Sequence, residues 1–254
     1  MKIPQIYIQG KGKPFIWLHG MLNSVKSDSL YSLVDFKELS KIVSLVRYDA
    51  CDQWIGGDYS WNGLTEELIR IADAHKYDSM ILGGCSMGSG TAVHAAIRFP
   101  EMVKALVLVT PPPAWEMRSS TKVVYEKVAL KANPNFIPEI VKRIIQLNLD
   151  PPDFFEKMHP GTRQRLLEYH LSFEPQYYFS IYHGGAISDF PTREQIGEIR
   201  VPTLIVTDPN DKNHPIEIAR ELKLLIPNAE MIQVSGYDDY KKLQENIRDF
   251  VQAI

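Results

Sequence analysis

A serine between two glycines is the first residue of the chain that could carry out chemistry. The segment GCSMG at 84–88 follows a short apolar run at 79–86 and precedes a helical pattern. In a G-x-S-x-G turn between a strand and a helix, the serine sits in a strained bend that exposes its hydroxyl, and larger side chains in place of the glycines would collide. The N–H of Met87 opens the helix and can face developing negative charge. The pattern predicts that Ser86 is a nucleophile; an accidental turn is the alternative.

A serine hydroxyl needs an adjacent base at neutral pH. The chain has seven histidines: His19, His75, His94, His159, His170, His183 and His214. His214 follows an apolar run at 203–208, and Asp208 and Asp211 lie just before it. A catalytic triad is defined by geometry and roles rather than by chain order. We therefore expect His214 to be the base, with Asp211, Asp208 or Asp239 holding its second ring nitrogen.

The other histidines have simpler explanations. His75 ends a helical pattern, where positive charge is favourable, and His94 lies in the helix after the serine, where we expect a packed core histidine. Three more lie in the long region at 111–199 and could line a pocket: His159, His170 and His183. His214 itself could instead only cap the helix that starts at Pro215, and a site without a proper base remains a further alternative.

The elements that would position these residues alternate between strand and helix. Apolar runs of strand length lie at 5–8, 15–20, 41–50, 79–86, 105–110, 203–208 and 230–234. Helical patterns lie at 61–76, 90–99, 215–226 and about 240–253. Strands that alternate with helices predict an α/β fold, a mostly parallel sheet with helices on both faces.

One long region interrupts this alternation. Residues 111–199 hold no convincing strand but show helical patterns at 121–132, 136–149 and 162–173. A structureless loop of that length is improbable in a compact domain. The sequence therefore predicts a core of residues 1–110 and 200–254, with a helical cap at 111–199.

Composition excludes several classes of protein. The chain has 254 residues, is 44% hydrophobic and 23% charged, and has a net charge of −3, which gives no electrostatic footprint for nucleic acid or anionic membranes. No apolar run approaches the ~20 residues of a membrane span, and the start of the chain does not read as a secretory signal. Cys51 and Cys85 are expected to be reduced thiols in a cytoplasmic protein. Without clustered metal ligands or a separate phosphate loop, we expect no metal and no cofactor; the oligomeric state stays open.

The motifs together resemble the α/β-hydrolase superfamily over nearly the whole chain. They are GCSMG at 84–88, WLHGM at 17–21 and VPTLIVTDPNDKNHP at 201–215. The resemblance implies that the N–H of Met21 is the second oxyanion donor beside that of Met87, and that His19 is structural.

Further positions follow from the same resemblance. It places the triad acid on Asp211 and a helical cap between the sixth and seventh strands. The segments 111–118 and 183–192 resemble a lactonase-like or esterase-like branch. In the usual strand order, the strand before Asp211 lies two positions from the serine strand, about 10 Å away at ~4.8 Å per spacing. The usual histidine loop starts one strand further out and still reaches the serine, so distance does not exclude His214.

Two segments depart from the family pattern. The D-x-R-G-x-G segment is replaced by YDACDQWIGG at 48–57, and the role of this altered loop stays open. The usual catalytic histidine follows the last strand, but that register falls on GYDD at 236–239, and no histidine occurs after His214.

Two functions of different class follow. The first is a serine hydrolase that acts on a small ester, lactone or related carbonyl substrate. In it Ser86 attacks, His214 oriented by Asp211 moves the proton, and the N–H groups of Met21 and Met87 hold the oxyanion. Its partner is a small molecule, and neither nucleic acid nor membrane is expected. The alternative is a degenerate protein of the same fold that binds a ligand with weak turnover or none.

Overall fold

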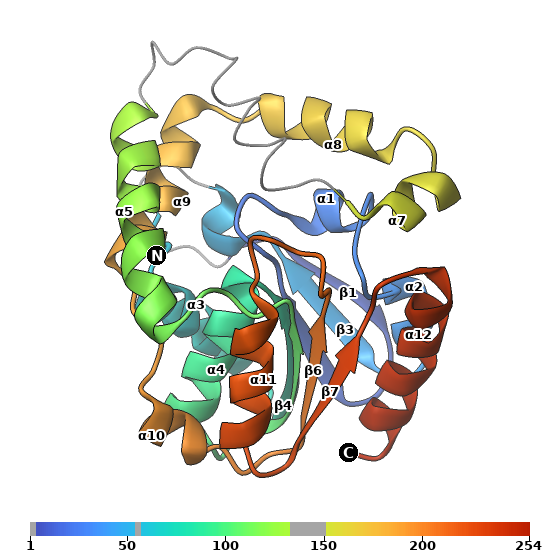
Figure 1. Ribbon diagram of the computed structural model, residues 1–254. Helices are drawn as coiled ribbons and strands as arrows, with labels where there is room; N and C mark the ends of the chain where they lie inside the picture. The colour runs from blue at the N-terminus through green and yellow to red at the C-terminus, as the bar shows by residue number, and fades with distance from the viewer. Residues whose placement is uncertain (1–3, 54–56, 133–150) are drawn as a thin grey trace.

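A seven-stranded sheet lies at the centre of the protein (Figure 1). The computed structural model describes residues 4–53, 57–132 and 151–254. The strands are β1 (Ile6–Gly10), β2 (Pro14–Leu18), β3 (Ser44–Tyr48), β4 (Met80–Cys85), β5 (Val103–Val109), β6 (Thr203–Thr207) and β7 (Ala229–Gln233). Their order is β1-β3-β2-β4-β5-β6-β7, and only β1 is antiparallel to its neighbour. The predicted mostly parallel sheet is confirmed, with β6 two positions from β4.

The helices alternate with these strands. Before the serine lie α1 (Val25–Asp28), α2 (Phe36–Leu39), the 3-10 helix η1 (Ala50–Gln53) and α3 (Trp61–Ala74). After it come α4 (Met87–Arg98), α5 (Trp115–Lys131), α7 (Asp153–Met158), α8 (Thr162–Leu171), α9 (Pro175–Ile187), α10 (Arg193–Gly197), α11 (Ile216–Leu225) and α12 (Tyr237–Gln252). Local caps set several starts: the Ser60 side chain accepts the Gly63 N–H at 3.1 Å before α3, which satisfies a donor that the helix itself cannot pair.

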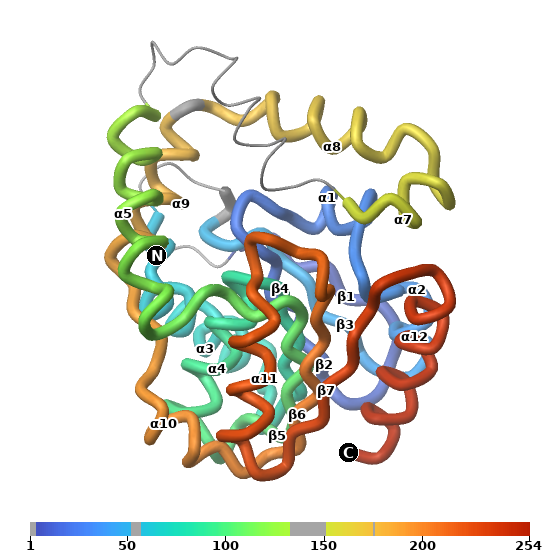
Figure 2. Tube along the Cα trace, viewed as in Figure 1, coloured from blue at the N-terminus to red at the C-terminus, as the bar shows by residue number. Residues whose placement is uncertain are grey.

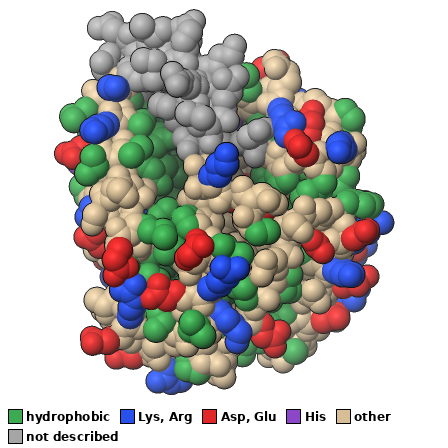
Figure 3. Space-filling view, viewed as in Figure 1, with side chains coloured by type: hydrophobic (Ala, Val, Ile, Leu, Met, Phe, Trp, Pro, Cys, Tyr) green, Lys and Arg blue, Asp and Glu red, His purple; other side chains and the backbone are tan. Residues whose placement is uncertain are grey.

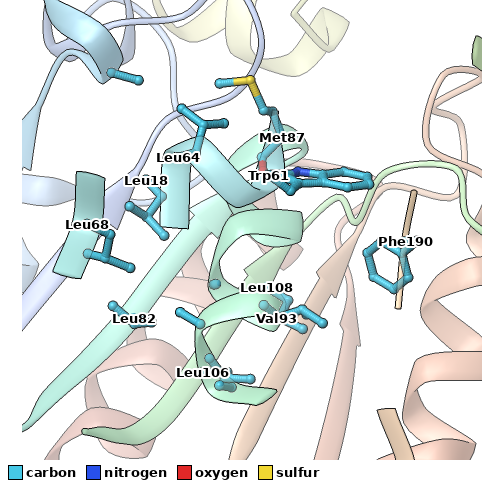
Figure 4. Close-up of a cluster of buried hydrophobic side chains, with 14 of the residues drawn as sticks. Leu18, Trp61, Leu64, Leu68, Leu82, Met87, Val93, Leu106, Leu108 and Phe190 are labelled. Carbon is cyan, nitrogen blue, oxygen red and sulfur yellow. Dashed lines mark hydrogen bonds between the residues drawn. The ribbon is translucent and has the colours of Figure 1, made fainter. Parts of the chain in front are cut away.

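Both faces of the sheet are buried, which explains why its central strands are apolar throughout. Leu106 and Leu108 of β5 face the core formed with α3, α4 and α11, and Figure 4 shows them beside Val93 of α4. Val107 and Val109, which alternate with them, face the core formed with α2 and α12. The prediction of helices on both faces is therefore confirmed.

The described helices between β5 and β6 are those of the expected cap region. α5 lies along α9, while α7 and α8 lie over the end of the sheet where β6 leads into α11 (Figures 1 and 2). The family resemblance placed the cap between the sixth and seventh strands, but it follows the fifth here because the sheet has seven strands among the described residues. The helical pattern at 136–149 lies outside the described residues, and the division at 111–199 stays a prediction.

The surface carries mixed charge on the face seen in Figure 3, where basic and acidic side chains are interspersed. Within the described residues, Cys51 and Cys85 form no disulfide. In the same part of the chain, every helix is too short or too polar to cross a membrane.

Candidate active site

Ser86 lies in a strained bend between β4 and α4. Its φ of 50° and ψ of −110° belong to a region that residues other than glycine rarely adopt. Two backbone hydrogen bonds hold it there: the Ser86 N–H donates to Val109 O at 3.0 Å, and the Gly90 N–H donates to Ser86 O at 3.1 Å. The bend separates the Ser86 side chain from the pleat of the strand and turns it toward the cavity described below.

The two flanking glycines are required by close contacts. A Cβ atom on Gly84 would lie 2.4 Å from the carbonyl carbon of Gly88, and one on Gly88 would lie 1.9 Å from Leu18 O. Real Cβ atoms do not approach backbone this closely, so the strand, the bend and the helix fit together only with glycine at both positions. The predicted reason for the G-x-S-x-G spacing therefore agrees with the geometry.

His214 contacts both Ser86 and Asp211. Its Nε2 lies 2.8 Å from Ser86 Oγ, and its Nδ1 lies 2.7 Å from Asp211 Oδ2. The side chains of His214 and Asp211 are 17% and 24% exposed. A hydroxyl next to an imidazole that a carboxylate orients is the arrangement that allows serine to lose its proton during attack.

Asp211 also builds the loop that carries His214. Its Oδ1 accepts the N–H groups of Asn213 at 2.8 Å and of His214 at 3.2 Å, a local turn typical of aspartate. Its own N–H donates to Asp208 O at 3.1 Å. One carboxylate thus shapes the β6–α11 loop with one oxygen and holds the imidazole with the other.

The electrostatics separate the two aspartates of this loop. Burial raises the pKa of Asp211, but its hydrogen bonds with the His214 ring and with the amides of Asn213 and His214 outweigh burial and hold that pKa below its ordinary value. Burial raises the pKa of Asp208, whose Oδ1 accepts the Asn210 N–H at 2.8 Å. Asp211 is therefore the carboxylate kept ionised next to the imidazole.

The third candidate acid lies elsewhere. Asp239 Oδ2 accepts the N–H of Ser235 at 3.0 Å and its hydroxyl at 2.7 Å, at the start of α12. The register 236–239, where the family places its histidine, thus forms the first turn of a helix and the residue before it. Of the three aspartates left open by the sequence, Asp211 is the one bonded to His214.

The other six histidines, all within the described residues, have different surroundings. His19 is buried, and its Nε2 accepts the Ala50 N–H at 2.9 Å, which agrees with the structural role that the resemblance implies. The His94 ring packs beside Trp61, and burial lowers its pKa to about 4. His75, His159 and His183 lie against aromatic rings, and His170 is buried between backbone carbonyls.

The His19 ring and the Glu67 carboxylate hold the start of the altered loop after β3. His19 binds the Ala50 N–H, and the Cys51 N–H donates to the Glu67 carboxylate at 3.0 Å and 3.1 Å. Residues 54–56 of this loop lie outside the described residues. The two contacts anchor the start of the loop without the usual arginine of the family segment.

The predicted oxyanion donors lie on two elements beside Ser86. Met21 belongs to a tight turn closed by the Asn23 N–H, which donates to Gly20 O at 3.0 Å, and Met87 is the first residue of α4. Within the described residues, neither the Met21 N–H nor the Met87 N–H has a protein acceptor. Both residues line a small recess together with Ser86.

A cavity of about 1160 Å³ opens over Ser86 and His214. Its wall includes Tyr31 between α1 and α2, Tyr125 and Tyr182 from α5 and α9, and the β6–α11 loop. This volume is slightly above the roughly 300–1,000 Å³ of common small-molecule sites. The three tyrosines give the cavity aromatic walls.

Two charged residues of these walls were missed from the sequence. Asp28 is buried in the cavity wall and accepts hydrogen bonds from Trp17 Nε1 at 2.8 Å and Asn23 Nδ2 at 3.3 Å; mainly because of burial, its pKa is raised to about 7. Arg118 is buried in the recess with its guanidinium 4.4 Å from the Trp61 ring. Asp28 belongs to no local motif. Arg118 ends the segment 111–118 that resembles a lactonase-like or esterase-like branch, but that resemblance gave this arginine no role.

Comparison with known proteins agrees with this architecture. Residues 52–241 match the family model described as alpha/beta hydrolase fold. AB hydrolase superfamily protein YisY of Bacillus subtilis is 28% identical over 95% of this chain and 91% of its own length. An enol-lactonase from Burkholderia xenovorans LB400 superposes with a TM-score of 0.81 at 18% identity, covering 98% of this chain and 96% of that one. A thermophilic esterase from Thermogutta terrifontis gives a TM-score of 0.80 at 19% identity, covering 98% and 93%. The chain belongs to the alpha/beta hydrolase fold family.

Proposed function

We propose that the protein is a serine hydrolase of small esters, lactones or related carbonyl compounds. The observation that carries the proposal is the chain of contacts from Asp211 through His214 to Ser86, with 2.7 Å and 2.8 Å between the bonded atoms. The acid and the base stand on one loop, so the histidine absent after the last strand has a counterpart here. That contact favours the hydrolase over a degenerate ligand-binding protein, which was suggested by the missing histidine.

The first half of the reaction transfers the acyl group to the enzyme. Ser86 Oγ attacks the carbonyl carbon while its proton passes to His214 Nε2, and the carbonyl oxygen becomes an oxyanion. When the tetrahedral intermediate collapses, the bond to the leaving oxygen breaks and His214 returns the proton to that oxygen. The alcohol leaves, and Ser86 carries the acyl group as an ester.

The second half repeats these steps with water. Water attacks the acyl carbon as His214 takes one of its protons, and collapse releases the acid as the proton returns to Ser86 Oγ. Throughout, Asp211 stabilises the imidazolium and fixes the ring. The N–H groups of Met21 and Met87 supply the oxyanion donors, each of which is worth on the order of 10²–10³ in rate.

The substrate class rests on the cavity and on the relatives. The aromatic walls of the cavity suit an apolar group of the substrate. Solved structures of similar fold include proteins named as an enol-lactonase and an esterase. A curated relative that is 22% identical over 77% of this chain is named a putative carbamate hydrolase. These names support a carbonyl substrate with an oxygen or nitrogen leaving group.

A fluorophosphonate probe tests the proposal. We expect rapid labelling of the wild type, with the adduct found on the peptide that contains Ser86, and hydrolysis of an aryl acetate by the same protein. Ser86→Ala should lose both, whereas Ser120→Ala, which removes an exposed hydroxyl in the same cavity, should keep both. No labelling of the wild type, or equal hydrolysis by Ser86→Ala, would contradict the proposal.

A further inference from the structure

The turn that carries Met21 is strained. Gly20 O accepts the Asn23 N–H, and Leu22, the third residue of this turn, has a φ of 63°. A positive φ at that position favours glycine, and for a leucine it is strained because Cβ crowds the neighbouring carbonyl oxygen. Such a conformation persists only where the surroundings hold it, so the contacts of Leu22 determine the shape of the turn.

The cap helix α8 supplies those contacts. His170 Nε2 lies 2.8 Å from Leu22 O, and the Tyr169 hydroxyl is hydrogen bonded to the Ser24 hydroxyl. Two successive residues of α8 thus contact the segment that directly follows Met21. His170 and Leu22 are both buried, so water does not compete for the carbonyl.

The contact acts on a single rigid unit. The Leu22 C=O and the Asn23 N–H belong to one peptide group, which is planar. His170 binds the oxygen of that group, and Gly20 O accepts its N–H. A peptide plane held on both sides cannot rotate, and its orientation sets the turn from which the Met21 N–H projects.

We propose that His170 is a positioning residue: its Nε2–H holds the Leu22 carbonyl and thereby aims the Met21 N–H at the oxyanion. This inference rests on the proposed function. A carbonyl oxygen can only accept, so this bond requires the proton on Nε2. The second ring nitrogen, Nδ1, lies 2.6 Å from Leu166 O in the preceding turn of α8, and this carbonyl is an acceptor too. A neutral imidazole carries one N–H, and the proposal assigns it to Nε2. The cap helix that covers the cavity therefore also shapes the oxyanion site.

Two variants distinguish the two ring nitrogens. In His170→Gln the side-chain amide nitrogen takes the place of Nε2, so it can donate to Leu22 O. In His170→Asn the shorter side chain brings its amide nitrogen only to the place of Nδ1. We expect the Gln variant to keep kcat close to the wild type. The Asn variant should lose a large part of the roughly 10²–10³ in kcat that one oxyanion donor contributes, with KM little changed, because the interaction is made only in the transition state. His183→Asn, on an exposed cap histidine stacked on Phe179, should behave as the wild type.

The outcomes separate this inference from the proposed function. Wild-type turnover that depends on Ser86 but is equal in both His170 variants, or is kept by Asn and lost by Gln, would overturn the inference alone. Absence of Ser86-dependent turnover in the wild type would overturn the proposed function and the inference with it. If the variants do not fold, the ¹⁵N shifts of His170 in the wild type decide the matter: a protonated Nε2 supports the inference, and an unprotonated one overturns it.

Discussion

Asp211 Oδ2 and His214 Nδ1 lie 2.7 Å apart on the same loop, three residues from each other along the chain. An acid and a base so close in sequence depend on one local turn rather than on the docking of two separate loops. The turn is made by Asp211 itself, through its bonds to the N–H groups of Asn213 and His214. The orientation of the imidazole is thus built into the β6–α11 loop.

Replacing the acid should impair turnover without loss of binding. In Asp211→Asn the amide cannot stabilise the imidazolium, and we expect kcat on an aryl acetate to fall by roughly 10²–10⁴, with a smaller change in KM. Asp208→Asn is the matched control, because the Asp208 carboxyl accepts the Asn210 N–H and has no bond to His214. Comparable losses in the two variants would show that Asp211 has no special role.

Adding a methyl group at the bend should destabilise the fold. In Gly88→Ala the new Cβ would lie 1.9 Å from Leu18 O, so β2 and α4 must move apart, which costs at least about 1–3 kcal/mol. Gly236→Ala is the control, since nothing lies within 4 Å of its Cβ position. Urea unfolding measures both, and a Gly88→Ala variant as stable as Gly236→Ala would refute the close packing of the elbow.

The buried carboxyl of Asp28 should make stability depend on pH. Mainly because of burial, its pKa rises from 3.8 to about 7 on folding, so between these values the folded state holds more protons than the unfolded state. The free energy of unfolding should therefore decrease as pH rises from about 4 to 7, by at most about 1.4 kcal/mol per pH unit for this group. In Asp28→Asn that decrease should be smaller, as measured by urea unfolding at pH 5 and pH 8. An equal change in the free energy of unfolding between pH 5 and pH 8 in the wild type and in Asp28→Asn would exclude this contribution of Asp28.

Much of the fold could be predicted from the sequence because its central strands are buried on both faces. The apolar runs at 79–86 and 203–208 contain the whole of β4 and β6. Boundaries were less certain: the helix expected at 61–76 ends at Ala74, with His75 as its C-cap, and the last helix starts at Tyr237 rather than near 240. These ends depend on caps and backbone angles that apolar periodicity does not record.

Only those site residues that belong to local sequence motifs could be predicted. Ser86 follows from its glycines, and His214 follows from its place after an apolar run beside Asp211. Asp28 and His170 could not be assigned in this way, because their burial against the turn at 20–23 depends on the packing of α1 and α8. The catalytic roles of Ser86, His214 and Asp211 stay predictions that rest on the geometry.

The proposed mechanism depends on His214 as the base for Ser86. The rate of Ser86 acylation by an aryl acetate, followed by rapid mixing at neutral pH, tests it directly. His214→Ala should slow acylation by roughly 10²–10⁴, the usual contribution of a positioned base, while His159→Ala, which removes an exposed cap histidine, should not. Acylation of Ser86 in His214→Ala at the wild-type rate would contradict the role of His214 as the base.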